Sequence, residues 1–257
     1  MRVPSLSIPA FALATLAAAP ALATGLPEVT LSDCTEAVGL DVIPAANARP
    51  LVPDEFELLP ADEAGQLAVI IVRVVECGGI AVNNLPPTPG RFMHVGISLA
   101  NGEPDADANN YQLWFATNHI PLRLAMAAAG VEADLDAIEY DFDDVTGALE
   151  IEVSPWRAPD FTMSGSAFLL DIPRSPFIAS WFAEGRRGLV RMRGEYEGVL
   201  FGVSDAVLTT PADSELAALA GRDTLGFAVL NTYNDVPDGE VAYTFVDADD
   251  CRPRRRR

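Results

Sequence analysis

Short segments with the two-residue alternation of a β-strand recur roughly ten times along this chain, and glycine or proline separates most of them. Only residues 120–129, 212–220 and 177–184 have the spacing of helices. Strands this closely spaced favour a barrel or sandwich over a doubly wound sheet. We predict a mainly β (α+β) fold, a single closed or partly open β-barrel with two or three short helices.

Two segments carry the strongest strand signal. Residues 67–75 read LAVIIVRVV, a run that is typical of a strand covered on both faces. We expect Gly78-Gly79 to end this strand and residues 80–84 to form a short partner. Residues 91–100 alternate, with His94 on the polar face.

The remaining chain gives weaker indications. Residues 24–54 are rich in proline and weakly periodic, which predicts a lead-in that wraps the domain. Residues 120–129 form the clearest helix, closed by Gly130 and capped by Asn118 or Thr117.

Both ends of the chain carry their own signals. Residues 1–23 hold one arginine, a short apolar stretch and a small-x-small ending at Ala23, which predicts a secretory signal peptide. We therefore expect a secreted or periplasmic protein with one β-rich domain, residues 24–251, and an arginine-rich tail, residues 252–257. No later segment is long and apolar enough for a membrane span, so no membrane contact is expected after cleavage.

The charged residues exclude several functions. The chain contains no lysine, which removes Schiff-base chemistry, a pyridoxal-phosphate anchor and a phosphate-loop lysine. Residues 24–251 hold 11 arginines against 37 acidic residues, a net charge of −26. A field of this sign repels nucleic acid, so we expect no nucleic-acid partner.

The three cysteines are Cys34, Cys77 and Cys251. In an oxidising compartment two of them should form a disulfide. Cys34 can pair with Cys77 or with Cys251, and the sequence leaves both pairings open.

Arginine supplies the first candidate site residue. Arg73 interrupts the apolar run at 67–75 and points to the same face as Val69, Ile71 and Val75. A buried guanidinium needs a carboxylate, a group of carbonyls or an anionic ligand beside it. The two hypotheses are a structural ion pair and an anion site.

A second arginine cluster lies further along the chain. On a strand, Arg191, Arg193, Glu195 and Glu197 share one face. This face either lines a barrel interior, where the arginines grip a ligand carboxylate, or faces solvent and forms cross-strand ion pairs.

Histidine could add acid–base chemistry, and His94 and His119 are the two candidates. Two histidines without a paired spacing predict no metal site. No glycine-rich fingerprint follows a strand and opens a helix, so no cofactor is expected.

The layout of the chain adds a resemblance. Residues LVPDEF at 51–56, a buried strand, a strand with a polar face, YQLWF at 111–115 and then a helix resemble the order in acetoacetate-decarboxylase-like β-barrel proteins. The chain is also similar to secreted proteins of unassigned function. The resemblance covers most of residues 50–246 and implies the barrel fold. It does not imply the decarboxylase reaction, because that family's decarboxylases use a Schiff-base lysine.

Three functional hypotheses follow. The first is a secreted β-barrel that binds a small anionic or carboxylate-bearing molecule through Arg73, Arg191, Arg193, His94 and Glu195. The second is a lysine-independent hydrolase or lyase on the same barrel, with a histidine or glutamate as acid or base. The third is a structural exported protein without a pocket. Whether the chain is an enzyme stays open at this point.

Overall fold

The computed structural model describes residues 26–135 and 137–246, and within them the fold is mainly β, as predicted. The strands are β1 (Glu28–Pro44), β2 (Leu67–Val82), β3 (Thr88–Ser98), β4 (Ala108–Thr117), β5 (Asp134–Leu135), β6 (Ala137–Phe142), β7 (Ala148–Ser154), β8 (Phe161–Leu169), β9 (Ser175–Gly185), β10 (Gly188–Ser204), β11 (Val207–Thr209), β12 (Thr224–Leu225) and β13 (Leu230–Phe245). The helices are α1 (Ala45–Ala48), α2 (Ile120–Ala129), α3 (Glu215–Ala220) and the 3-10 helix η1 (Arg49–Leu51). The expected signal peptide, Cys251 and the arginine tail lie outside the described residues.

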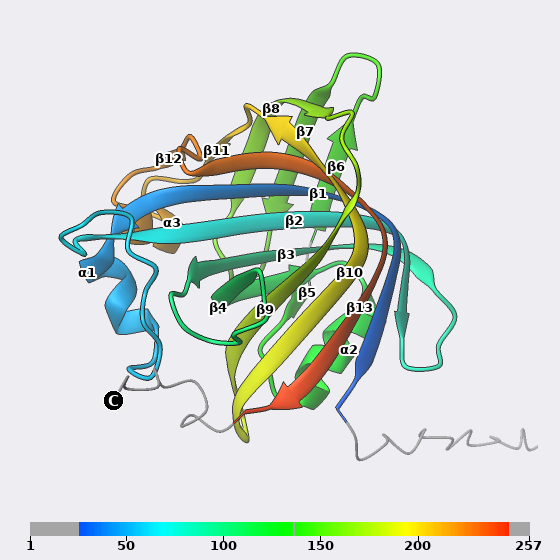
Figure 1. Cartoon of the computed structure of the whole chain (residues 1–257), viewed down its shortest axis with the longest axis horizontal. Helices are drawn as coiled ribbons and strands as arrows, with labels where there is room; N and C mark the ends of the chain where they lie inside the picture. The colour runs from blue at the N-terminus through cyan, green and yellow to red at the C-terminus, as the bar shows by residue number, and fades with distance from the viewer. Residues whose placement is uncertain (1–25, 136, 247–257) are drawn as a thin grey trace, which may run out of the picture.

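Seven strands close into a barrel in the order β10, β13, β1, β2, β3, β4 and β9 (Figure 1). Neighbours in this barrel are antiparallel except β4 and β9. Residues 108–111 of β4 pair in parallel with residues 179–182 of β9, and β9 pairs with β10. These contacts close the predicted barrel, which removes the free edges that an open sheet would expose.

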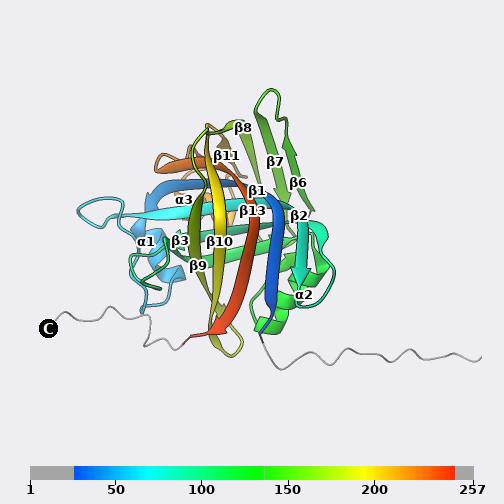
Figure 2. The ribbon, with the colours of Figure 1, turned by 45° about the vertical axis from the view of Figure 1, so that its right-hand side comes forward.

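A second, smaller sheet stands beside the barrel wall (Figure 2). It contains β6, β7, β8, β11 and β12, and it joins the barrel where residues 167–169 of β8 pair with residues 202–204 of β10. The apolar faces of the barrel and of this sheet share one buried cluster, which includes Ile70, Val72, Val95, Ile151, Val153 and Met163.

A separate apolar cluster fills the barrel interior. It includes Leu31, Val75, Phe92, Phe115, Trp181 and Met192. Helix α2 packs against this cluster through Leu122, Ala125 and Met126, and the hydroxyl of Tyr243 donates to the sulfur of Met126 at 3.2 Å. Strand β2 therefore faces two cores, which confirms that residues 67–75 are covered on both sides.

The structure corrects the expectation that residues 24–54 are a lead-in. Residues 28–44 form β1, which pairs with β2 on one side and β13 on the other. Pairing along both edges satisfies the backbone of β1, and this long-range gain outweighs its weak apolar period.

Two further predictions on secondary structure are wrong. Residues 177–184 lie in β9 rather than in a helix, because this aromatic segment pairs with β4 and β10. Strand β2 also continues through Gly78-Gly79 to Val82, because it stays paired with β1 along this stretch. A side chain at Gly79 would lie 2.4 Å from the hydroxyl oxygen of Ser32 on β1. Glycine lets the strands approach here instead of ending β2.

The helix predictions at 120–129 and within 212–220 are confirmed as α2 and α3. The N-cap of α2 is His119, not Asn118 or Thr117, because Nδ1 of His119 accepts a hydrogen bond from the Leu122 amide at 3.2 Å. The other ring nitrogen of His119 lies 2.7 Å from the Thr88 hydroxyl. One nitrogen of His119 therefore caps α2, and the other contacts the first residue of β3.

Candidate functional site inside the barrel

Arg73 lies inside the barrel, with 7 % of its surface exposed. Its Nε donates to Oε2 of Glu36 at 2.6 Å, and its Nη2 donates to the hydroxyl of Tyr196 at 3.2 Å. The guanidinium carbon also lies 5.6 Å from the ring centre of Phe92 and 5.5 Å from that of Tyr196. Burial works against the charge, but Glu36 and Tyr196 outweigh it and raise the pKa of Arg73, so this side chain stays cationic.

Glu36 balances that charge, so Arg73 forms the structural ion pair that the sequence offered as one of two hypotheses. Its Oε1 accepts a hydrogen bond from Nδ2 of Asn234 at 2.9 Å, while Oε2 accepts from Arg73. The carboxylate is thus held from β13 and from β2 at once. This arrangement gives the buried pair the additional hydrogen bond that a stable interior ion pair needs.

His94 lies directly opposite Arg73, since β2 and β3 pair these two residues in register. Its Nδ1 is 2.9 Å from Oε1 of Gln112, and its ring stacks on Trp181 with ring centres 4.4 Å apart. Burial, and then the charge of Arg73, hold the pKa of His94 well below its usual value. His94 is therefore neutral at neutral pH.

The Gln112 contact sets which nitrogen of His94 carries the hydrogen. An amide oxygen can only accept, so Nδ1 of His94 donates to Oε1 of Gln112 in this arrangement. The other nitrogen, Nε2, is then left as a hydrogen-bond acceptor. A neutral imidazole with a fixed tautomer can act as a general base.

A cavity of about 30 Å³ lies between these side chains, with room for about two water molecules. All seven barrel strands contribute to its lining, which includes Val29, Arg73, His94, Phe115, Trp181, Met192, Tyr196 and Tyr243. The indole Nε1 of Trp181 is buried and has no hydrogen-bond partner among the described residues. A buried donor of this kind calls for an acceptor such as an ordered water or a bound molecule.

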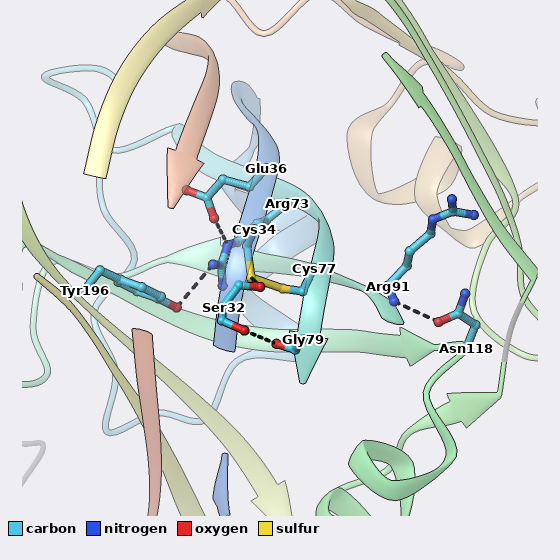
Figure 3. Close-up of a disulfide and its surroundings, with 9 residues drawn as sticks. All are labelled: Ser32, Cys34, Glu36, Arg73, Cys77, Gly79, Arg91, Asn118 and Tyr196. Atoms are coloured by element: carbon cyan, nitrogen blue, oxygen red, sulfur yellow. Dashed lines mark hydrogen bonds and ion pairs between the residues drawn. A yellow bond between two sulfur atoms is a disulfide. The ribbon is translucent and has the colours of Figure 1, made fainter. Parts of the chain in front are cut away.

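A disulfide links the strands that carry the ion pair (Figure 3). Cys34 and Cys77 face each other in the β1–β2 register, with their Cα atoms 4.0 Å apart. Of the two pairings that the sequence left open, the structure contains Cys34–Cys77. Because Cys34 precedes Glu36 by two residues on β1, the disulfide fixes this stretch of β1 against the strand that holds Arg73.

The second arginine cluster lies elsewhere. Met192 and Tyr196 of β10 line the interior cavity, so the alternating residues Arg191, Arg193 and Glu195 face outward. This is the ion-paired outer face that the sequence offered as one of two alternatives, and it does not bring these residues to Arg73 or His94.

The outward arginines are held by acidic neighbours. Arg191 and Arg193 both lie 2.7 Å from Oε1 of Glu103. Arg193 also pairs with Asp105 at 3.2 Å and with Glu195 at 2.6 Å. These contacts form a network across neighbouring strands on the outer surface.

The comparisons with known proteins give a fold. No sequence-family model matches the chain, and no curated protein matches its sequence. The enduracididine biosynthesis enzyme MppR complexed with pyruvate matches with a TM-score of 0.59 and 11% identity, over 90% of this chain and 94% of that one. This chain has the acetoacetate-decarboxylase-like fold.

Two other solved structures agree with this fold. Acetoacetate decarboxylase from Legionella pneumophila matches with a TM-score of 0.53 and 10% identity, over 86% of this chain and 87% of that one. An acetoacetate decarboxylase-like enzyme from Sphingomonas wittichii RW1 matches with a TM-score of 0.53 and 11% identity, over 85% and 91%. The resemblance in layout is confirmed, and it concerns the fold alone.

Sequence reasoning missed four residues of the interior site, namely Glu36, Gln112, Trp181 and Tyr196. One signal was present: alternation along β10 places Tyr196 opposite Arg193 and Glu195, so an outward charged face implies an inward Tyr196. Glu36 and Trp181 had no such signal, because their segments were interpreted as a lead-in and a helix.

Proposed function

We propose that this chain is an exported protein that binds a small carboxylate-bearing molecule inside its barrel. The observation that carries this proposal is the shared lining of one cavity by Arg73 and Trp181. Arg73 is a permanent cation, and its contacts with Glu36 and Tyr196 use two of its five N–H groups. Together with the unpartnered Nε1 of Trp181, it offers an anion more than one donor.

The cavity limits the size of the ligand. A volume of about 30 Å³ accommodates a carboxylate group and little else without movement of the lining side chains. The MppR structure with pyruvate supports a small acid as the ligand class, because it has the same fold and holds a molecule of that class. We therefore expect formate, acetate or pyruvate to be recognised before any larger acid.

His94 supports a second candidate function, a lysine-independent hydrolase or lyase. The neutral imidazole lies opposite Arg73, and its Nδ1 is fixed by Gln112. In this version, Arg73 binds the carboxylate and Nε2 of His94 removes a proton from the bound molecule or from a water. The decarboxylase reaction through a Schiff base is excluded, because the chain has no lysine.

Export is supported by the expected signal peptide and by the Cys34–Cys77 disulfide. Within residues 26–135 and 137–246, no helix is long and apolar enough to cross a membrane.

The test is calorimetry and thermal shift with formate, acetate and pyruvate. The critical variant is Arg73→Met combined with Glu36→Gln, which removes the buried charges together so that neither is left unpaired. Arg193→Gln, on the outer surface, is the matched control. We expect at least a tenfold loss of affinity in the double variant and unchanged affinity in the control. The proposal fails if no acid raises the melting temperature, or if the double variant binds as well as the parent.

A further inference from the structure

A wide groove opens where the pairing between β4 and β9 stops. Strands β4 and β9, both labelled in Figure 1, pair only through residues 108–111 and 179–182. Beyond that point residues 183–185 of β9 pair with β10, and residues 116–117 of β4 pair with β5. The groove has a volume of about 1050 Å³, and its lining includes Tyr111, Gln112, Ala183, Glu184 and Gly185 from these diverging segments.

The groove extends to side chains that belong to the barrel interior. Ala183 is part of the interior apolar cluster, and Gln112 is 7 % exposed and hydrogen-bonded to His94 at 2.9 Å. His94 in turn lines the interior cavity. The pair formed by Gln112 and His94 therefore connects the groove to the cavity.

Trp181 lies at the same junction from the opposite side. Trp181 belongs to β9, yet its indole lies against Gly96 on β3, on the other side of β4. A Cβ atom added at Gly96 would lie only 2.9 Å from Cζ3 of Trp181. The indole thus reaches beneath β4 to contact both Gly96 and His94. The absence of a side chain at Gly96 makes this position possible, and Trp181 lines the interior cavity beside His94, the partner of Gln112.

We propose that this groove is the entrance to the interior cavity and that Gln112 is the gate residue that closes it. The inference rests on the proposed function, since an interior ligand needs a route through the wall. Opening the gate breaks the buried hydrogen bond between Gln112 and His94. Gln112 then controls which small molecules reach Arg73.

The charge of the groove suits an acid as the molecule that enters. Its lining contains three arginines and four acidic residues, a net charge of −1: Arg123, Arg157, Arg186, Glu132, Asp134, Glu184 and Glu215. Residues 24–251 as a whole carry −26. Per residue, the groove lining is thus about half as acidic as the chain overall, which lowers the repulsion that an approaching carboxylate meets.

The test measures the access of small solutes to Trp181 and needs no knowledge of the ligand. The chain has three tryptophans, so Trp114→Phe with Trp156→Phe leaves Trp181 as the sole indole. In this background we expect weak fluorescence quenching by acrylamide and iodide, because Trp181 is 3 % exposed. Gln112→Ala should raise the quenching constant at least threefold, and adding Ala183→Leu, which fills the inner end of the groove, should lower it again.

Val29→Ala is the matched control, because Val29 lines the cavity from β1, away from the seam between β4 and β9. The inference is overturned if Gln112→Ala leaves quenching unchanged, or if Val29→Ala raises it equally. Urea unfolding of each variant separates opening of the gate from loss of structure, and Gln112→Ser serves as a milder substitution if the alanine variant does not fold. Calorimetry with acids is a separate measurement, so failure of the gate and failure of carboxylate binding can be told apart.

Discussion

Nε of Arg73 lies 2.6 Å from Oε2 of Glu36 inside the barrel, and each side chain is only 9% exposed. The two residues belong to neighbouring strands that a disulfide also joins, Cys34–Cys77. A cation and an anion so placed neutralise each other, which lets an apolar barrel contain both. The same pair also shapes the chemistry of the cavity, because Arg73 is the cation that lies opposite His94.

Removing one member of this pair should be costly. We expect Arg73→Met to lower the free energy of unfolding by about 3–5 kcal/mol, because the carboxylate of Glu36 is left buried without its cation. The double variant, Arg73→Met with Glu36→Gln, should lower the free energy of unfolding by about 2 kcal/mol less than the single change does, because no unpaired buried charge is left. Urea unfolding in a double-mutant cycle measures both values. Additive effects of the two substitutions would contradict a coupled buried pair.

The stability of the protein should fall between pH 7 and pH 5 because of His94. The unfolded chain binds a proton at His94 below about pH 6.5, whereas burial and Arg73 keep the folded histidine neutral. The unfolded state then binds more protons, so stability rises with pH in this window, by up to about 1.4 kcal/mol per pH unit.

Two measurements check this. Urea unfolding at several pH values should show a smaller slope for His94→Gln than for the parent. In NMR spectra the ring protons of the two histidines can be told apart, and those of His94 should keep the shift of a neutral ring at pH 5. An equal slope in the variant, or a protonated His94 at pH 5, would show that the imidazole is not held neutral.

The disulfide should contribute a large part of the stability. Cys34 and Cys77 are 43 residues apart, and closing a loop of this length stabilises a fold by about 4 kcal/mol in the chain-entropy model. Cys34→Ala with Cys77→Ala should lower the free energy of unfolding by an amount of that order. Peptide mapping after alkylation of the native protein should find both cysteines unlabelled. Labelling of either one, or a loss below about 1 kcal/mol, would argue against this link.

The outer arginine network should matter much less. Arg193 pairs with Glu103, Asp105 and Glu195 near the surface, where water and salt screen the charges. We expect Arg193→Gln to change the free energy of unfolding by no more than about 1 kcal/mol. If Arg193→Gln lowered the free energy of unfolding as much as Arg73→Met, this surface cluster would have a larger structural role than its position near solvent predicts.

The N-terminus gives a direct test of export. If residues 1–23 are a cleaved signal peptide, protein recovered from outside the cytoplasm should begin at Thr24. N-terminal sequencing or intact mass spectrometry measures this. Replacing Ala21 and Ala23 with bulky residues should leave the longer, uncut chain. Recovery of full-length protein from the cytoplasm alone would contradict the prediction.

Sequence reasoning recovered the strands with strong alternation and the helix closed by Gly130, because these depend on neighbouring residues. It failed at β1, whose sequence is weakly periodic, and at β9, whose sequence is compatible with a helix. Each of these strands is paired along both edges with segments far away in the chain. Local patterns do not contain that information.

The sequence by itself determined that Arg73 lies within an apolar strand and must have a partner, and that lysine chemistry is absent. It also determined that Arg191, Arg193 and Glu195 share one face. Only the tertiary structure decided which face of each strand is inside, which acid meets Arg73 and which cysteine meets Cys34. The physical reason is that alternation assigns side chains to two faces, whereas closure of the barrel chooses which of those faces is buried.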